Sequence, residues 1–157
     1  MNKIYLTNTD IQKYVSTIVS QLYKDNWRPD YIVGITRGGL TPSVMLSQFT
    51  GIKMHTLDVR LRDGDEKESN LWMADDAQAG KNILVLDDIN DTGATFNWIM
   101  EDWDVSHDYP DEKTNVRFAV LMDNLASDCK VNMSYIGTEI NKAEDPSWIV
   151  FPWEEWW

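Results

Sequence analysis

Apolar residues in the first half of the chain alternate between helical and strand-like spacing. Between residues 11 and 22 they recur at helical intervals, which predicts an amphipathic helix with Thr9 as its N-cap and an end near Asn26. The β-rich run at 31–35 predicts a short strand, and a second helix is expected to begin at about Leu40. A glycine loop joins this strand to the helix, so the order is strand, loop, helix.

The second half of the chain repeats this order. A helix is expected from Ala94 to about Trp103, while residues 60–80 are polar and poorly periodic, so most of them are expected to form a long mobile loop. Apolar runs predict strands at 54–59, 83–86, 116–122 and 148–151 and, more weakly, at 133–136. Alternating strands and helices predict an α/β fold, a mainly parallel sheet flanked by helices that binds ligands beyond the carboxyl ends of its strands.

The length and composition predict one domain over residues 1–157. A chain of 157 residues with 43% hydrophobic content can bury one core. No stretch approaches the ~20 apolar residues that a membrane helix needs, and the first ten residues are too polar for a signal peptide. The single cysteine, Cys129, can form no internal disulfide and fits a reducing cytoplasm. We therefore expect a soluble, cytoplasmic protein with no membrane partner.

The formal net charge of −12 argues against a nucleic-acid partner, because proteins that bind nucleic acid need clustered Lys and Arg. A phosphorylated ligand on so acidic a protein must be held by something other than net charge. Backbone N–H groups, a helix N-terminus or a metal ion can do this.

The segment at 83–95, ILVLDDINDTGAT, offers such a phosphate site. Its small-residue turn leads from a buried strand into a helix and consists of Thr92, Gly93, Ala94 and Thr95. These residues would place backbone N–H groups and two hydroxyls around a monophosphate at the positive end of the helix. An ordinary turn is the alternative interpretation.

Two carboxylates, Asp87 and Asp88, stand between that strand and the turn. They can accept hydrogen bonds from vicinal ribose hydroxyls and help to hold a hydrated Mg²⁺, with Asp88 as the expected metal ligand. Taken alone, the pair could also be a solvated strand end. The combination of carboxylates, phosphate turn and helix favours a ribose 5-phosphate site.

The whole segment resembles the phosphoribosyl-pyrophosphate signature of the type I phosphoribosyltransferases. The resemblance implies the fold of that family, with phosphoribosyl pyrophosphate as substrate and Mg²⁺ as cofactor. It places Asp91 near ring nitrogen 7 of a purine as the catalytic residue, and Asp87 and Asp88 beside the ribose and the metal. It also implies a flexible hood over the substrate, here at about 60–80.

The glycine loop at 34–40 resembles the pyrophosphate loop of the same family. In that family the peptide bond before the Arg position is commonly cis, which here would be the bond between Thr36 and Arg37. Arg37 and Gly38 are therefore expected to bind pyrophosphate. Lys67 falls near a basic position of the hood, and either binds pyrophosphate or is a solvated surface lysine.

The C-terminal segment is similar to that of the xanthine-guanine phosphoribosyltransferases, which implies a small base-binding segment at about 124–157. By this resemblance Trp148 stacks on a purine, and backbone groups around Ile149 bind its edge. The subgroup has a Lys where this chain has Asn124, an amide that could bind the 6-oxo group less selectively. Lys130 is the alternative donor.

These observations predict a purine phosphoribosyltransferase of the salvage type that acts on guanine, xanthine or hypoxanthine. Two alternatives remain: transfer to another base such as a pyrimidine, and a regulator on the same fold that senses nucleotide or phosphoribosyl pyrophosphate without turnover. The expected partners are these small-molecule substrates. An aromatic cluster at the C-terminus, three Trp residues within the last five positions, suggests contact with another subunit in a homodimer or homotetramer.

Overall fold

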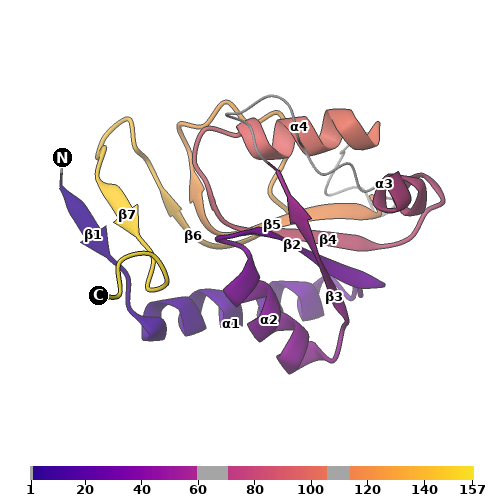
Figure 1. Cartoon of the computed structure of the whole chain (residues 1–157), viewed down its shortest axis with the longest axis horizontal. Coiled ribbons are helices and arrows are strands. Elements are labelled where there is room, and N and C mark those ends of the chain that lie inside the picture. The colour runs from indigo at the N-terminus through magenta and orange to yellow at the C-terminus, as the bar shows by residue number, and fades with distance from the viewer. Residues whose placement is uncertain (1, 60–70, 106–113) are drawn as a thin grey trace.

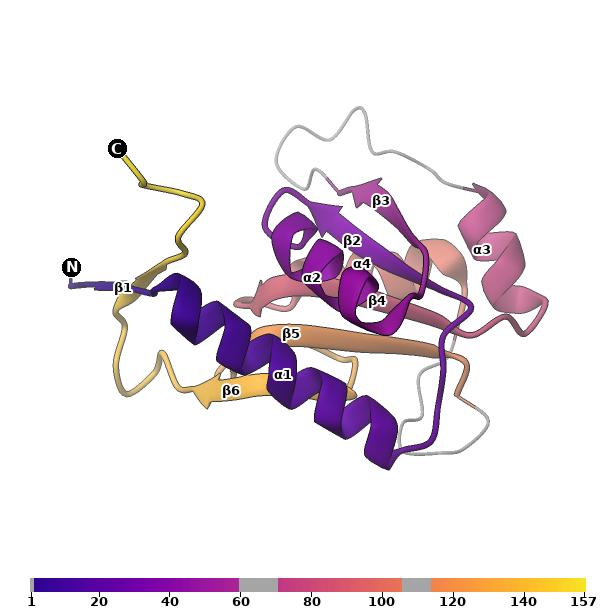
Figure 2. The ribbon, with the colours of Figure 1, turned by 90° about the horizontal axis from the view of Figure 1, so that it is seen from below.

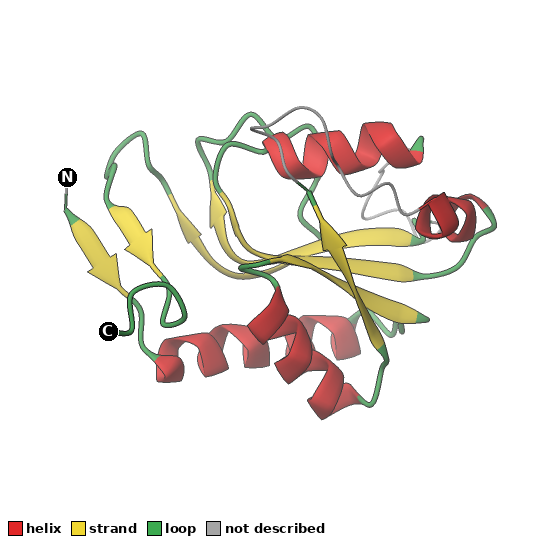
Figure 3. Ribbon diagram, in the orientation of Figure 1, coloured by secondary structure: helices red, strands yellow, loops and turns green. Residues whose placement is uncertain are grey.

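A parallel five-stranded sheet forms the centre of the molecule, in the strand order β3-β2-β4-β5-β6 (Figures 1 and 3). The structure is a computed structural model that describes residues 2–59, 71–105 and 114–157. Its elements are β1 (Lys3–Tyr5), α1 (Asn8–Lys24), β2 (Tyr31–Thr36), α2 (Leu40–Thr50), β3 (Met54–Asp58), α3 (Leu71–Gln78), β4 (Ile83–Asn90), α4 (Ala94–Trp103), β5 (Val116–Asn124), β6 (Tyr135–Ile140) and β7 (Trp148–Val150). The α/β fold expected from the sequence is confirmed.

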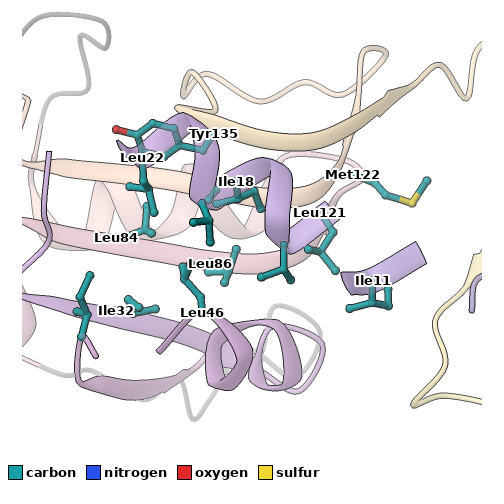
Figure 4. Close-up of a cluster of buried hydrophobic side chains, with 14 of the residues drawn as sticks. Ile11, Ile18, Leu22, Ile32, Leu46, Leu84, Leu86, Leu121, Met122 and Tyr135 are labelled. Atoms are coloured by element: carbon teal, nitrogen blue, oxygen red, sulfur yellow. The ribbon is translucent and has the colours of Figure 1, made fainter. Parts of the chain in front are cut away.

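Helices cover both faces of this sheet, as its alternation of elements predicted. Helices α1 and α2 pack on one face, and α3 and α4 pack on the other (Figures 1 and 2). Side chains of β4 alternate between the two cores, with Leu84 and Leu86 on the side of α1 and Ile83 and Val85 on the side of α3. Figure 4 shows the first of these cores. Over the described ranges, no helix combines the length and apolar character needed to cross a membrane.

A second, two-stranded sheet joins the two ends of the chain (Figure 1). Strand β1 pairs in parallel with β7, so that Lys3 lies opposite Trp148. The Lys3 Nζ also forms an ion pair of 2.9 Å with Glu155. The sequence predicted β7 but not β1, because a three-residue strand is too short to show a period.

The segment expected to be mostly loop between residues 60 and 80 contains a helix. Residues 60–70, including Lys67, lie outside the described residues, whereas Leu71–Gln78 form α3. Met73 and Ala77 of this helix are buried in the core shared with α4. The prediction of a loop was wrong for α3, because only two of its eight residues enter the core and the periodic signal is weak.

Helix α1 begins two residues earlier than its pattern predicted. Its N-cap is Thr7, whose side chain accepts a hydrogen bond from the Asp10 N–H at 3.1 Å, while the Asp10 carboxylate accepts one from the Thr7 N–H at 2.8 Å. This reciprocal pair is a capping box. Thr9, the predicted cap, lies inside the helix.

Replacing Thr7 by Ala is expected to lower the free energy of unfolding by about 1 kcal/mol, because the first turn loses its cap. Thr9→Ala is the matched control and should be neutral or slightly stabilising, since Ala is the better helix former. Urea unfolding of the two variants and the parent protein measures both values. Equal losses in the two variants would contradict the assignment of the cap.

Candidate active site

The carboxyl ends of β2 and β4 and the C-terminal segment meet around one pocket. Its volume is about 480 Å³, and its walls are formed by Arg37, Gly38, Asp88, Trp148, Trp153 and Glu154. Four of these six residues were predicted as site residues from the sequence, from three separate segments. Trp153 and Glu154 were not. The structure therefore brings the expected pyrophosphate loop, ribose carboxylate and base-binding Trp to one place.

The two carboxylates at the end of β4 are held in place by backbone hydrogen bonds. The Asp88 N–H donates to Asp87 Oδ1 at 2.8 Å, and the Ile89 N–H donates to Asp88 Oδ1 at 2.7 Å. Burial raises the pKa of Asp87 well above its ordinary value, and the neighbouring charge of Asp88 raises it further. Burial also raises the pKa of Asp88. Such a pair is suited to a ligand that supplies hydroxyl donors or positive charge.

The same carboxylates suit a Mg²⁺ ion that keeps most of its waters, rather than one whose ligands all come from the protein. Among the described residues there is no group of three or more His, Cys, Asp or Glu side chains placed to hold a metal ion. Mg²⁺, however, usually keeps several waters and binds through one or two carboxylates together with substrate phosphates. Asp88 lines the pocket and offers a hard oxygen of this kind.

The loop between β2 and α2 packs directly against these carboxylates. The peptide bond between Thr36 and Arg37 is cis, as the family resemblance led us to expect. A β-carbon at Gly38 would collide with the Asp88 carboxylate, and one at Gly39 would collide with the Leu86 carbonyl oxygen. Glycine is thus required at both positions for the loop to approach β4 so closely.

The predicted phosphate turn lies at the N-terminus of α4. Thr92 and Ala94 are exposed, and no side chain caps the helix from Gly93, its N-cap. The Ala94 N–H donates to Thr92 Oγ1 at 3.3 Å. Thr95 follows in the first helical turn and is partly exposed. This arrangement leaves the positive end of α4 accessible to an anion.

Gly93 was expected to be glycine so that a phosphate could approach closely, and its packing against Cys129 gives a second reason. Its φ is 90°, and a β-carbon there would lie 2.5 Å from the backbone N of Cys129. The Asp128 N–H donates to the Thr92 carbonyl at 3.0 Å. The turn is therefore packed against the loop that follows β5, so a side chain at Gly93 would disturb that packing whether or not a phosphate is bound.

The two residues expected to bind a base lie differently in β7. Trp148 is 46% exposed and lines the pocket, whereas Ile149 is 6% exposed and belongs to the core. The exposed ring of Trp148 offers a stacking surface, because nearly half of the residue is not covered by the core. Any contact between Ile149 and a base would involve its backbone.

The Asn124 side chain hydrogen-bonds to backbone groups and does not line the pocket. Its side chain is buried, its Nδ2 donates to the Asp91 carbonyl at 2.8 Å, and its Oδ1 accepts from the N–H groups of Ala126 and Lys142 at 3.1 and 3.0 Å. Asn124 therefore ties together the loops that follow β4, β5 and β6. This positioning role differs from the direct base contact expected for it.

A lysine that the sequence analysis overlooked lies beside two predicted site residues. The Lys142 ammonium group is 3.0 Å from Asp91 Oδ1 and 5.1 Å from the centre of the Trp148 ring. Lys130, the donor considered from the sequence, is an exposed residue whose N–H donates to Asn97 in α4. Lys142 follows the carboxyl end of β6 at Ile140. Had the sequence predicted this end instead of residue 136, Lys142 would have been expected at the same edge of the sheet as the other candidate residues.

Known proteins resemble this chain in both sequence and fold. The family model described as "Phosphoribosyl transferase domain" matches residues 1–157. A xanthine-guanine phosphoribosyltransferase of Cereibacter sphaeroides is 28% identical over 133 residues, which cover 82% of this chain and 70% of the relative. Among solved structures, a purine phosphoribosyltransferase from Pyrococcus horikoshii has a TM-score of 0.70 at 26% identity and covers 99% of this chain and 95% of its own.

A hypothetical protein from Neisseria gonorrhoeae with bound ppGpp has the same fold, with a TM-score of 0.72, 20% identity, and coverage of 98% of this chain and 89% of its own. The parallel sheet of the present structure, flanked by helices, is the type I phosphoribosyltransferase fold. The family match spans the whole sequence and agrees with this fold. The chain therefore belongs to the phosphoribosyl transferase domain family.

Proposed function

We propose that this protein transfers the ribose 5-phosphate group of phosphoribosyl pyrophosphate to guanine, xanthine or hypoxanthine, forming a nucleoside monophosphate and pyrophosphate in purine salvage. The observation that carries this proposal is the single pocket shared by Arg37, Asp88 and the exposed ring of Trp148. It offers the groups needed for pyrophosphate, ribose and a flat base. The names of the relatives support a purine as the acceptor.

In the proposed reaction, nitrogen 9 of the base forms a bond to the anomeric carbon as the bond from that carbon to pyrophosphate breaks. The residues at 92–95 would hold the 5-phosphate, and Arg37 and Gly38 would position the pyrophosphate. Asp87 and Asp88 would accept hydrogen bonds from the ribose hydroxyls and stabilise the positive charge that develops on the sugar. Asp88 would also hold Mg²⁺, which would offset the charge of the leaving pyrophosphate.

Asp91 is the proposed general acid–base residue. It lies in the turn between β4 and the phosphate-binding residues, and its carbonyl is fixed by Asn124. Its carboxylate pairs with the Lys142 ammonium group, which also lies over the Trp148 ring. A purine stacked on Trp148 would place ring nitrogen 7 toward Asp91, which could accept or relay its proton.

Activity with phosphoribosyl pyrophosphate, Mg²⁺ and a panel of bases tests the proposal. We expect nucleotide formation with guanine, xanthine or hypoxanthine and far slower formation with adenine and uracil. Exclusive use of uracil would favour a pyrimidine enzyme. Binding of phosphoribosyl pyrophosphate without turnover of any base would favour a regulator.

Replacing Trp148 by Ala should raise the KM for the purine about 10-fold, because loss of a stacked base typically costs about 1–3 kcal/mol. The KM for phosphoribosyl pyrophosphate should change little. Since Trp148 is half exposed, the melting temperature should also change little. Trp156→Ala is the control, because Trp156 is 77% exposed and does not line the pocket. A folded Trp148 variant with an unchanged purine KM would refute the stacking role.

Replacing Asp87 by Asn should lower kcat about 100-fold, the scale of one lost charge-stabilising group, yet raise the melting temperature. The pKa of Asp87 is raised in the folded protein, so its charged form destabilises the fold. The gain in melting temperature should be absent at acidic pH, where Asp87 is protonated in both the folded and the unfolded protein. It should grow as the pH rises from the ordinary pKa range of Asp toward the raised pKa of Asp87. Melting curves in a chelating buffer, with exposed Asp102→Asn as the control, measure this. A lower melting temperature at neutral pH would contradict the prediction.

A further inference from the structure

One ammonium group is shared between the proposed acid–base residue and the proposed stacking residue. Lys142 Nζ lies 3.0 Å from Asp91 Oδ1 and 5.1 Å from the centre of the Trp148 ring. The latter distance is within the range of a cation–π contact. The Lys142 side chain is only 18% exposed, so this is not a freely solvated surface lysine.

The backbone around Lys142 is fixed independently of its side chain. Asn124 Oδ1 accepts from the Lys142 N–H at 3.0 Å, and Asn124 Nδ2 donates to the Asp91 carbonyl at 2.8 Å. One buried amide therefore sets the separation of the two segments that carry the ion pair. Removing only the Lys142 ammonium would leave this anchor intact.

The position of the ammonium has a consequence for any base that stacks on Trp148. Such a base must lie beside the ammonium or displace it from the ring. A lysine ammonium has three N–H donors and no acceptor, so it can bind an exocyclic oxygen but gains nothing from an exocyclic amino group. A site built around it favours an oxo group at the edge of the base.

We propose that Lys142 is the specificity-determining residue of the base site, an inference that rests on the purine transfer proposed above. In the free protein its ammonium pairs with Asp91. When a 6-oxopurine stacks on Trp148, the ammonium donates a hydrogen bond to the exocyclic oxygen while Asp91 keeps it directed into the site. The cation thus comes from the loop after β6, whereas Asn124, the last residue of β5, positions that loop.

Product binding tests this role without requiring turnover. Calorimetric titration should show that the parent protein binds inosine monophosphate more tightly than adenosine monophosphate. Lys142→Met should weaken the binding of inosine monophosphate about 10-fold or more, because one hydrogen bond to a charged group is lost. The binding of adenosine monophosphate should weaken less than about twofold, because its amino group gains nothing from the ammonium group. Lys142→Leu provides an independent second variant, and melting temperatures confirm that both fold.

Lys130→Met is the matched control, because Lys130 is exposed and its backbone N–H donates to Asn97 of α4. The inference is overturned if Lys142→Met weakens both nucleotides equally, as a purely structural ion pair would, or leaves both unchanged. It is also overturned if the selective loss appears in Lys130→Met, or if the parent protein binds neither nucleotide. Selective binding that depends on Lys142, in a protein that forms no nucleotide from any base, would refute the proposed transfer and leave the role of Lys142 standing.

Discussion

The parallel pairing of β4 with β2 on one side and β5 on the other is the constraint on which the site depends. This register places Leu86 opposite both Gly34 and Ala119, so the three strands reach the same edge of the sheet in step. The turn after β2 can then pack against the carboxylates near the end of β4, at the contact between Gly38 and Asp88. Shifting one strand by a residue would direct these side chains to opposite faces and separate the groups.

A second constraint acts through the two ends of the chain. Trp148 reaches the pocket because β7 pairs with β1, and the Lys3–Glu155 ion pair lies close to the same two strands. The proposed base end of the site therefore depends on contacts between residues that are far apart in sequence, whereas the proposed phosphate end lies in one strand, turn and helix, with the turn packed against the loop after β5. Burial raises the pKa of both Asp87 and Asp88, so this part of the site disfavours negative charge on the two carboxylates.

The sequence was sufficient for the fold class and for the strand, turn and helix that carry the proposed phosphate site, because these depend on local patterns: an apolar run, adjacent acids and a small-residue turn. It was insufficient where contacts between residues far apart in the sequence determine a strand or the surroundings of a side chain. Strand β1 exists only through its pairing with β7. Asn124 was expected at the base, but its amide is taken up by backbone groups of three loops. Lys142 was missed because β6 was predicted to end at residue 136, four residues before its actual end at Ile140.

In the proposed site a nucleotide binds with its 5-phosphate at the N-terminus of α4 and its base on Trp148. A crystal structure of the protein with guanosine monophosphate and Mg²⁺ tests this most directly. We predict the phosphate at the backbone N–H groups of residues 92–95, the ribose hydroxyls at Asp87 and Asp88, and the purine ring stacked on Trp148. A nucleotide bound with its phosphate away from α4, or with its base away from Trp148, would contradict the claim.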